Sequence, residues 1–558
     1  MEIVDREMNR IDPEMKILKA CSLVLTVLVL GCSQTEQAEQ TNNDQPRELV
    51  PGVDIPLNPQ GDIRPKKKEP KRTLGLGLEA EAPPRRLVNT AGVIQPEVTK
   101  LLERIDASRQ EGPTVVAWVI DRSNSAANMV DGIRLQVQYY YDELAVEHEI
   151  LEQESQDKID EHNLHTAIYT FGETVECTLP VTRELKEAKA AFSAIPVDNT
   201  GIENSFAALK TAVDEVKQLR AEHGYEVFLV VVTDEAGDDQ QLAAEIRPDL
   251  SKYAMPLYVI GVNAPFGKRA ILPEHVEAGP NGQGNKTLIN QGPETRDLEQ
   301  LLLAYPAAGL SMDTVDSGYG PFTWELLCRS SGGVFLGLKA PGYTSSMLSR
   351  PGSRPVALIG SYGGSTMSKY APDYVSRAKY DEMIQANRAV KALLEVAQMK
   401  NIPTLINYQV DFDGVDVTRL NQALSQAQLG AAQIEPALNA AYNMLVAGES
   451  DREQLTKLRW QAGYDLAMGR ILAAKSRVEG YNAMLAALKR GKSFENEGST
   501  RWLLTPAEET EAGSAVKKIG ERAVEYLERV KTAHADTPWA QMAEMELQVP
   551  VGWKWMEQ

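Results

Sequence analysis

Oxygen-bearing side chains occur at three places in the chain where an apolar run ends or a helix is about to begin. They are Asp121, Ser123 and Ser125 in a D-x-S-x-S pattern, Thr200 further along, and Asp234 after the strongest apolar run. Hydroxyl and carboxylate oxygens suit a hard divalent cation such as Mg²⁺, which prefers near-octahedral oxygen coordination. No histidine or cysteine belongs to the set, which disfavours zinc or copper.

The segments around these residues alternate between apolar runs and helical periodicity. Apolar runs predict buried strands at 113–120, 165–171, 227–233 and 256–262, and residues spaced at helical intervals predict helices at 129–144, 201–222 and 241–254. Repeated strand–helix units predict an α/β fold, a doubly wound and mostly parallel sheet with helices on both faces. In such open sheets ligands bind outside the carboxyl ends of the strands, where the oxygen-bearing side chains lie in this sequence.

This combination resembles the von Willebrand factor type A (VWA) domain and its metal-ion-dependent adhesion site. The resemblance covers about residues 96–340, with a loop-rich insertion at about 264–322 and a closing helix and last strand at 323–338. It implies one divalent cation, Mg²⁺ first and Mn²⁺ or Ca²⁺ as alternatives, held by Asp121, Ser123, Ser125, Thr200 and Asp234. It also implies adhesion, in which an acidic residue of a partner protein completes the coordination of the cation.

Two features leave other interpretations open. Ser, Thr and Asp are also favoured at helix N-caps, where they need no metal. Glu235 follows Asp234 at a position where the family often has glycine. The extra acid would tune the affinity of the site or repel some acidic partners.

The N-terminal residues predict a targeting segment. In residues 15–32, MKILKACSLVLTVLVLGC, two lysines precede an apolar run that is short for a membrane span and has the length of a signal-peptide core. The run ends in Leu-Gly-Cys32, which resembles the lipobox of bacterial lipoproteins and implies a lipid on Cys32. Ser33 after the cysteine favours the outer membrane, facing the periplasm. Residues 1–14 are acidic, so translation is expected to start at Met15; a buried helix or a plain membrane anchor are the alternatives.

The remaining segments differ in composition. Residues 33–95 are polar and interrupted by prolines, which predicts a disordered tether, and 341–375 are rich in glycine, serine and proline, which predicts a linker. Residues 376–558 predict an all-α domain of helical hairpins, weakly similar to tetratricopeptide-type repeats but without a clean 34-residue period. Such a unit either offers a face to other proteins or simply packs.

Composition and motifs argue against two classes of function, nucleic-acid binding and catalysis. A formal net charge of −20 argues against nucleic acid as the partner. No H-E-x-x-H or G-x-S-x-G pattern is present, and although Glu235 or Asp238 could act as a base, nothing supplies an oxyanion partner, so no enzyme is expected. The sequence predicts a lipid-anchored cell-envelope protein that binds a partner protein through the cation. The alternative is a structural scaffold working through residues 376–558, with a vestigial or purely stabilising metal site.

Overall fold

A computed structural model describes most of the chain after residue 95. The described ranges are 96–154, 163–267, 270–275, 286–303, 315–338, 362–399, 402–405 and 408–558. The predicted signal segment with Cys32, the predicted tether and residues 341–361 of the predicted linker lie outside these ranges. Within them, no helix combines the length and the apolar character that a bilayer span requires.

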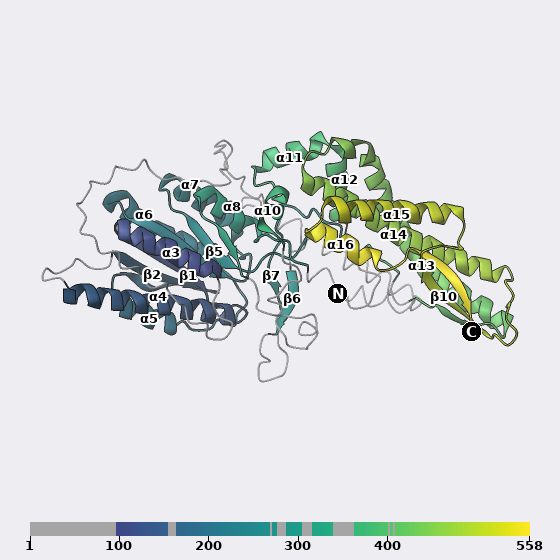
Figure 1. Ribbon diagram of the computed structural model, residues 1–558, viewed down its shortest axis with the longest axis horizontal. Helices are drawn as coiled ribbons and strands as arrows, with labels where there is room; N and C mark the ends of the chain where they lie inside the picture. Colours follow the sequence, from purple (N-terminus) through teal and green to yellow (C-terminus); the bar gives the residue numbers. More distant parts are fainter. Residues whose placement is uncertain are drawn as a thin grey trace, which may run out of the picture. The chain divides into compact units, whose positions relative to one another are not determined.

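A six-stranded sheet forms the centre of the first half of the chain (Figure 1). Its strand order is β3-β2-β1-β4-β5-β8, and all neighbouring pairs are parallel except β2 and β3. The strands are β1 (Thr114–Asp121), β2 (Leu164–Phe171), β3 (Val175–Thr182), β4 (Glu226–Thr233), β5 (Leu257–Gly261) and β8 (Phe335–Gly337). The doubly wound, mostly parallel sheet predicted from the sequence is therefore confirmed.

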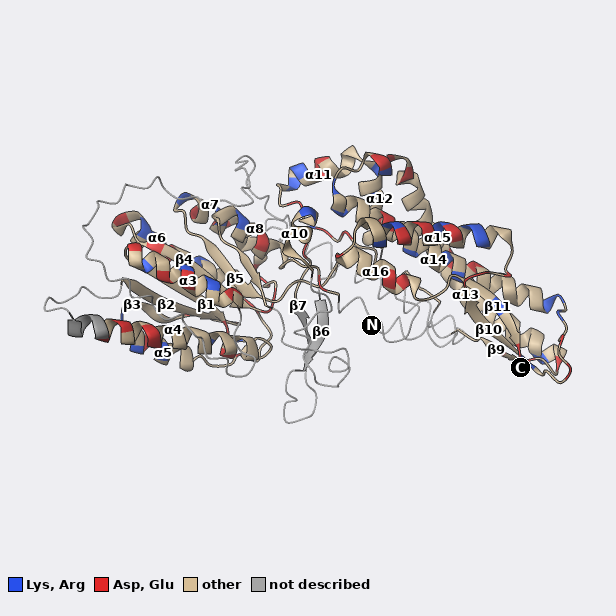
Figure 2. Cartoon of the chain, viewed as in Figure 1, with Lys and Arg blue, Asp and Glu red and all other residues tan. Residues whose placement is uncertain are grey.

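Helices cover both faces of this sheet because alternate residues of each central strand point to opposite sides. Val115, Ala117 and Val119 of β1 pack in one apolar cluster with α6, α7 and α8, and Val116 and Trp118 pack in a second with α3, α4 and α5. The helices are α3 (Pro96–Glu111), α4 (Ala127–Glu154), α5 (Leu185–Ser193), α6 (Ser205–His223), α7 (Ala243–Lys252) and α8 (Phe322–Ser331). Figure 2 shows acidic and basic residues interspersed along α4 and α6.

The C-terminal region is helical, as predicted. Its long helices α13 (Val417–Gly448) and α14 (Leu458–Lys489) lie with α11 (Arg377–Ala386), α12 (Arg388–Ala397), α15 (Ser514–Ala533) and α16 (Pro538–Leu547). Helix α14 is buried over nearly its whole length, as expected for a helix that is covered on all sides.

A small sheet joins these helices and was not predicted. Strands β9 (Asp411–Asp413), β10 (Arg501–Ala507) and β11 (Gly552–Glu557) pair antiparallel in the order β11-β10-β9. Trp553 and Trp555 in β11 and Trp502 in β10 are buried and belong to the apolar core of the helical region. The C-terminal region therefore combines helices with a sheet and is not purely helical.

Part of the predicted insertion packs into the same core as the C-terminal helices. Its two described strands, β6 (Ala270–His275) and β7 (Lys286–Asn290), form an antiparallel hairpin. After β7, Leu301 and Leu303 belong to the core cluster of the helical region. Arg459 of α14 donates to Glu294 at 2.9 Å and to Glu299 at 2.6 Å, with all three side chains buried. Buried ion pairs thus hold this segment against α14.

Candidate metal centre

Strand pairing brings Asp121 to the carboxyl edge of the sheet, beside the end of β4. Ile120 of β1 lies opposite Val232 of β4, so Asp121 stands next to Thr233. One carboxylate oxygen of Asp121 accepts the backbone N–H of Ser123 at 2.8 Å, and the other accepts the Thr233 hydroxyl at 2.8 Å. The carboxylate is buried and is fixed by one donor from the loop after β1 and one from the end of β4.

The two serines and Asp234 lie together at this edge. The hydroxyl oxygens of Ser123 and Ser125 are 3.0 Å apart, and Ser125 donates to Oδ1 of Asp234 at 3.2 Å. Ser123 Oγ also accepts the N–H of Ala126 at 3.3 Å, just before α4 begins, as an N-cap would. The structure therefore brings four of the five predicted ligands into one hydrogen-bonded group.

Thr200, the fifth predicted ligand, lies in an adjacent loop and is exposed. Its hydroxyl donates to Oδ1 of Asp198 at 2.6 Å, and its N–H donates to the same oxygen at 2.8 Å. The backbone of Asp198 pairs with the D-x-S-x-S segment, because Asn124 donates to its carbonyl at 3.2 Å. Thr200 thus lies two residues after Asp198, the residue through which this loop contacts the predicted site. The Thr200 hydroxyl is hydrogen-bonded to Asp198.

Sequence reasoning missed one acid at this edge, Glu203. It lies between Thr200 and α6 and is only 2% exposed. Its N–H donates to Oδ2 of Asp238 at 3.0 Å, and its carbonyl accepts the N–H of Asp238 at 2.9 Å. Its carboxyl interacts with that of Asp121, and its Oε2 is buried without a hydrogen-bond partner. The only signal for it in the sequence is an acid placed between Thr200 and the apolar positions of α6.

The edge concentrates negative charge. Burial, and then the charge of Asp121, raise the pKa of Glu203 to about 11. Burial and the charge of Asp234 raise the pKa of Glu235 to about 9, and burial also raises the pKa of Asp121. A divalent cation placed here would offset this repulsion, because buried charges are stable only when they are paired.

The donor set fits a hard cation better than a transition metal. Among the residues that the structure describes, no three His, Cys, Asp or Glu side chains converge as a metal site of those residue types would. The group consists of hydroxyls and carboxylates, which match the ligands of Mg²⁺. The buried, unpartnered Oε2 of Glu203 is an acceptor that a cation could satisfy.

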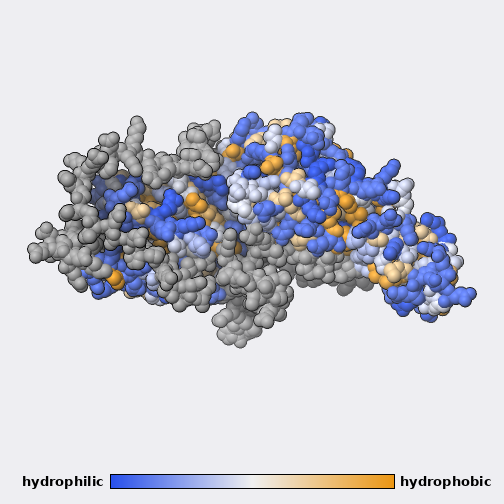
Figure 3. All heavy atoms as spheres, viewed as in Figure 1, coloured by the Kyte–Doolittle hydropathy of each residue, from blue (hydrophilic) through white to orange (hydrophobic). Residues whose placement is uncertain are grey.

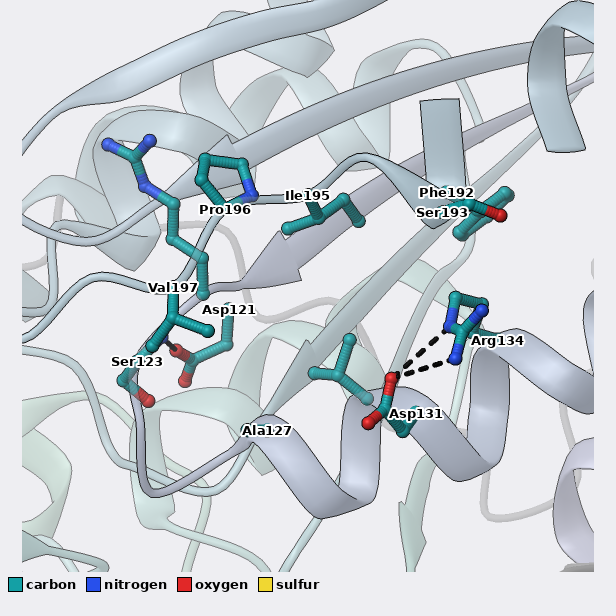
Figure 4. A pocket seen from close by; sticks show the side chains of 12 residues that line it. Asp121, Ser123, Ala127, Asp131, Arg134, Phe192, Ser193, Ile195, Pro196 and Val197 are labelled. Atoms are coloured by element: carbon teal, nitrogen blue, oxygen red, sulfur yellow. Dashed lines mark hydrogen bonds and ion pairs between the residues drawn. The ribbon is translucent and has the colours of Figure 1, made fainter. Parts of the chain in front are cut away.

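A pocket of about 160 Å³ lies beside the site, between the D-x-S-x-S segment, the start of α4 and the loop after α5 (Figure 4). Figure 4 shows Asp121, Ser123 and Val197 at one end of the pocket and the Asp131–Arg134 ion pair at the other. A partner side chain in this pocket would lie directly next to the predicted ligands.

The sheet topology, with hydroxyl and carboxylate side chains grouped at its carboxyl edge, is that of a VWA-type α/β domain. Residues 116–277 match the model of the von Willebrand factor type A domain, a class that often mediates protein interactions. Residues 116–277 therefore form a VWA domain, and the predicted resemblance to this domain is confirmed over that range.

Several solved structures are similar to part of the chain. The conserved hypothetical protein BatB from Bacteroides thetaiotaomicron is 15% identical at a TM-score of 0.25, covering 42% of this chain and 95% of its own. An aerotolerance-related membrane protein from Bacteroides fragilis is 14% identical at 0.24, covering 40% and 92%. Proximal thread matrix protein 1 from the mussel byssus, with a zinc-occupied MIDAS motif, is 16% identical at 0.19, covering 27% and 36%. No curated protein matches the chain. TM-scores this low support no inference, so the assignment rests on residues 116–277.

Proposed function

We propose that the VWA domain binds one divalent cation, Mg²⁺ as the first candidate, and uses it to hold an acidic residue of a partner protein. The ligands are Asp121, Ser123, Ser125, Thr200 and Asp234. The observation that carries the proposal is the hydrogen-bonded group of Asp121, the two serines and Asp234 at the carboxyl edge of the sheet. Thr200 would have to release Asp198 in order to join them.

The surface next to this edge suits a protein partner. Leu135, Tyr139 and Val146 of α4 are 49%, 39% and 56% exposed. Tyr139 and Val146 lie four and eleven residues after Leu135, which places all three on one face of the helix. This stripe begins one residue after Arg134, which lines the pocket. The partner segment would then carry an acidic residue that reaches the cation and apolar residues that pack along α4.

Panning a random-peptide phage library on the Mg²⁺-loaded chain, with EDTA elution, tests this function. We expect the eluted peptides to contain Asp or Glu, and to lose binding when that residue is replaced by alanine. The Asp121→Ala chain should release no such phage with EDTA. Peptides that stay bound in EDTA, or that bind Asp121→Ala equally well, would contradict the proposal.

A second candidate is a scaffold that recruits proteins through the C-terminal region, with a cation site that only stabilises the fold. The engagement of Thr200 by Asp198 favours it, because it leaves the predicted set one ligand short. Figure 3 shows the visible face of the C-terminal region as mainly hydrophilic with scattered apolar areas, and these do not single out a partner. Partner binding that survives Asp121→Ala would favour this scaffold.

We further propose that the chain is lipid-anchored in a bacterial cell envelope, at the outer membrane and facing the periplasm. The support is the sequence alone, a positive start and a short apolar run that ends at Cys32. Expression with an alkyne-tagged fatty acid should label the wild-type chain and place it in the membrane fraction. Cys32→Ser should lose both the label and the membrane association, and retained labelling would exclude this cysteine.

A further inference from the structure

The pocket beside the proposed cation site has apolar walls. The first turn of α4 contributes Ala127 and Val130, and the loop after α5 contributes Ile195 and Val197 on the opposite side (Figure 4). At about 160 Å³ the pocket is close in size to a cavity of about 150 Å³ that holds one benzene molecule. Its volume therefore suits a single side chain of the size of leucine, isoleucine or phenylalanine.

The polar side chains that line this pocket already have hydrogen-bond partners within the fold. Nε and Nη2 of Arg134 donate to Asp131 at 3.2 and 3.0 Å. The Ser193 hydroxyl donates to the carbonyl of Lys189 at 3.0 Å. The same holds for the other polar lining residues, which are Asp121, Arg122 and Ser123. A polar occupant would therefore give up its water for few new hydrogen bonds, whereas an apolar side chain has none to lose.

The charges that line the pocket also favour a neutral occupant. Two aspartates, Asp121 and Asp131, and two arginines, Arg122 and Arg134, line it, so their formal charges cancel. Nε of Arg122 has no hydrogen-bond partner, but this atom is itself buried, so an occupant would not reach it. A charged side chain would lose its hydration in the pocket without meeting an opposite net charge.

We propose that this pocket takes one uncharged apolar side chain of the partner, of leucine, isoleucine or phenylalanine size, from a position within two residues of the partner's acidic residue. The assignment rests on the proposed cation site and deepens it, because it names a second residue that the partner must carry. Asp121 and Ser123 belong both to the predicted ligands and to the lining of the pocket, so the two sites adjoin. Two residues of extended chain span about 7 Å, so one short segment reaches both.

Panning a peptide library with one fixed aspartate and random residues on both sides, on the Mg²⁺-loaded full chain, tests the assignment. We expect phage eluted by EDTA to carry Leu, Ile or Phe at one constant position within two residues of the aspartate. In a synthetic peptide of the most enriched sequence, alanine at that position should weaken binding to the wild-type chain at least about tenfold, because a buried side chain of this size is lost.

Val130→Phe fills the pocket from the first turn of α4, and Val146→Phe is the matched control. Val146 lies on the same helix but is 56% exposed and does not line the pocket. On Val130→Phe the parent and alanine peptides should differ less than about threefold, a margin set below the loss from full burial. Val146→Phe should keep the tenfold difference. Calorimetric titration with Mg²⁺ checks that Val130→Phe binds the cation as the wild type does.

The outcomes separate this assignment from the proposed function. If the peptides depend on Mg²⁺ and on the aspartate but show no constant apolar neighbour, or a charged one, the cation site stands and the pocket assignment fails. The assignment also fails if Val130→Phe, with wild-type affinity for Mg²⁺, discriminates between the two peptides as strongly as the wild type. If no peptide depends on Mg²⁺ and the aspartate, the proposed function and the assignment fail together. The alanine peptide probes the unmodified chain, so its result does not depend on how a variant folds.

Discussion

Acidic side chains are buried at two places in this molecule, and their neighbours differ. Beside the C-terminal helices, Glu294 and Glu299 both accept from the buried guanidinium of Arg459. In the same region Glu546 pairs with Arg470 at 3.1 Å and with Arg477. Each buried acid there has its own counter-charge from the chain.

At the carboxyl edge of the VWA sheet the neighbours of the buried acids are other acids. Asp121 and Glu203 interact with each other, and Asp234 and Glu235 add to the same negative field. The contacts that stabilise Asp121 come from a backbone N–H and a hydroxyl, which do not neutralise it.

The contrast separates a structural role from a binding role. Burying a charge without a partner costs several kcal/mol, and the chain avoids that cost around α14 by supplying arginines. At the sheet edge the buried acids have no such arginine partners. An exogenous cation could provide the missing positive charge there. Perturbed acids that cluster at the end of a sheet are therefore better candidates for a binding site than equally buried acids that are paired.

The largest loss of stability should follow from removing the arginine that pairs with Glu294 and Glu299. Arg459→Met keeps the volume of the side chain but leaves Glu294 and Glu299 buried without a counter-charge, which should cost about 3–5 kcal/mol of unfolding free energy in urea denaturation. The matched control is Arg377→Met. Arg377 pairs with Asp297 of the same segment, but its side chain is 48% exposed, so the change should stay below about 1 kcal/mol. Equal effects of the two variants would mean that the burial of an ion pair does not set the cost of breaking it, and would contradict the role assigned to the arginines around α14.

The fold was largely readable from the sequence where strands are buried on both faces. Continuous apolar runs placed β1, β4 and β5 within one residue of their observed ends. Edge strands carry a weaker pattern. β3 is half exposed and mixes Glu176 and Thr178 with apolar residues, and it was missed. The alternation of Trp553, Lys554 and Trp555 is a strand signal, but residues 376–558 were predicted to be all-α.

The candidate site was readable for a similar reason. Asp121 ends β1, Ser123 and Ser125 lie in the loop after it, and Asp234 follows β4, so local pattern and strand pairing suffice to bring them together. Glu203 depends on how the loop before α6 folds over the sheet edge and pairs with Asp238, and no local pattern encodes that. Its burial, and with it the excess of negative charge, became visible only in three dimensions.

The smallest expected effect is a change in how the stability of the C-terminal region depends on pH. His534 is buried, with Nδ1 3.0 Å from the Tyr370 hydroxyl, and burial lowers its pKa below 6.5, while Asp465 opposes and Arg452 assists that shift. Because the folded pKa is the lower one, the stability that His534 contributes is complete above pH 6.5 and is lost as pH falls through the folded pKa. His534→Gln should therefore lose less stability than the wild type between pH 7 and 5 in thermal unfolding.

This difference between His534→Gln and the wild type should be the same in Mg²⁺ and in EDTA, because the C-terminal region supplies its own counter-charges. Parallel pH profiles of the two proteins would show that the histidine does not titrate on unfolding, and a difference that depends on Mg²⁺ would couple the two clusters.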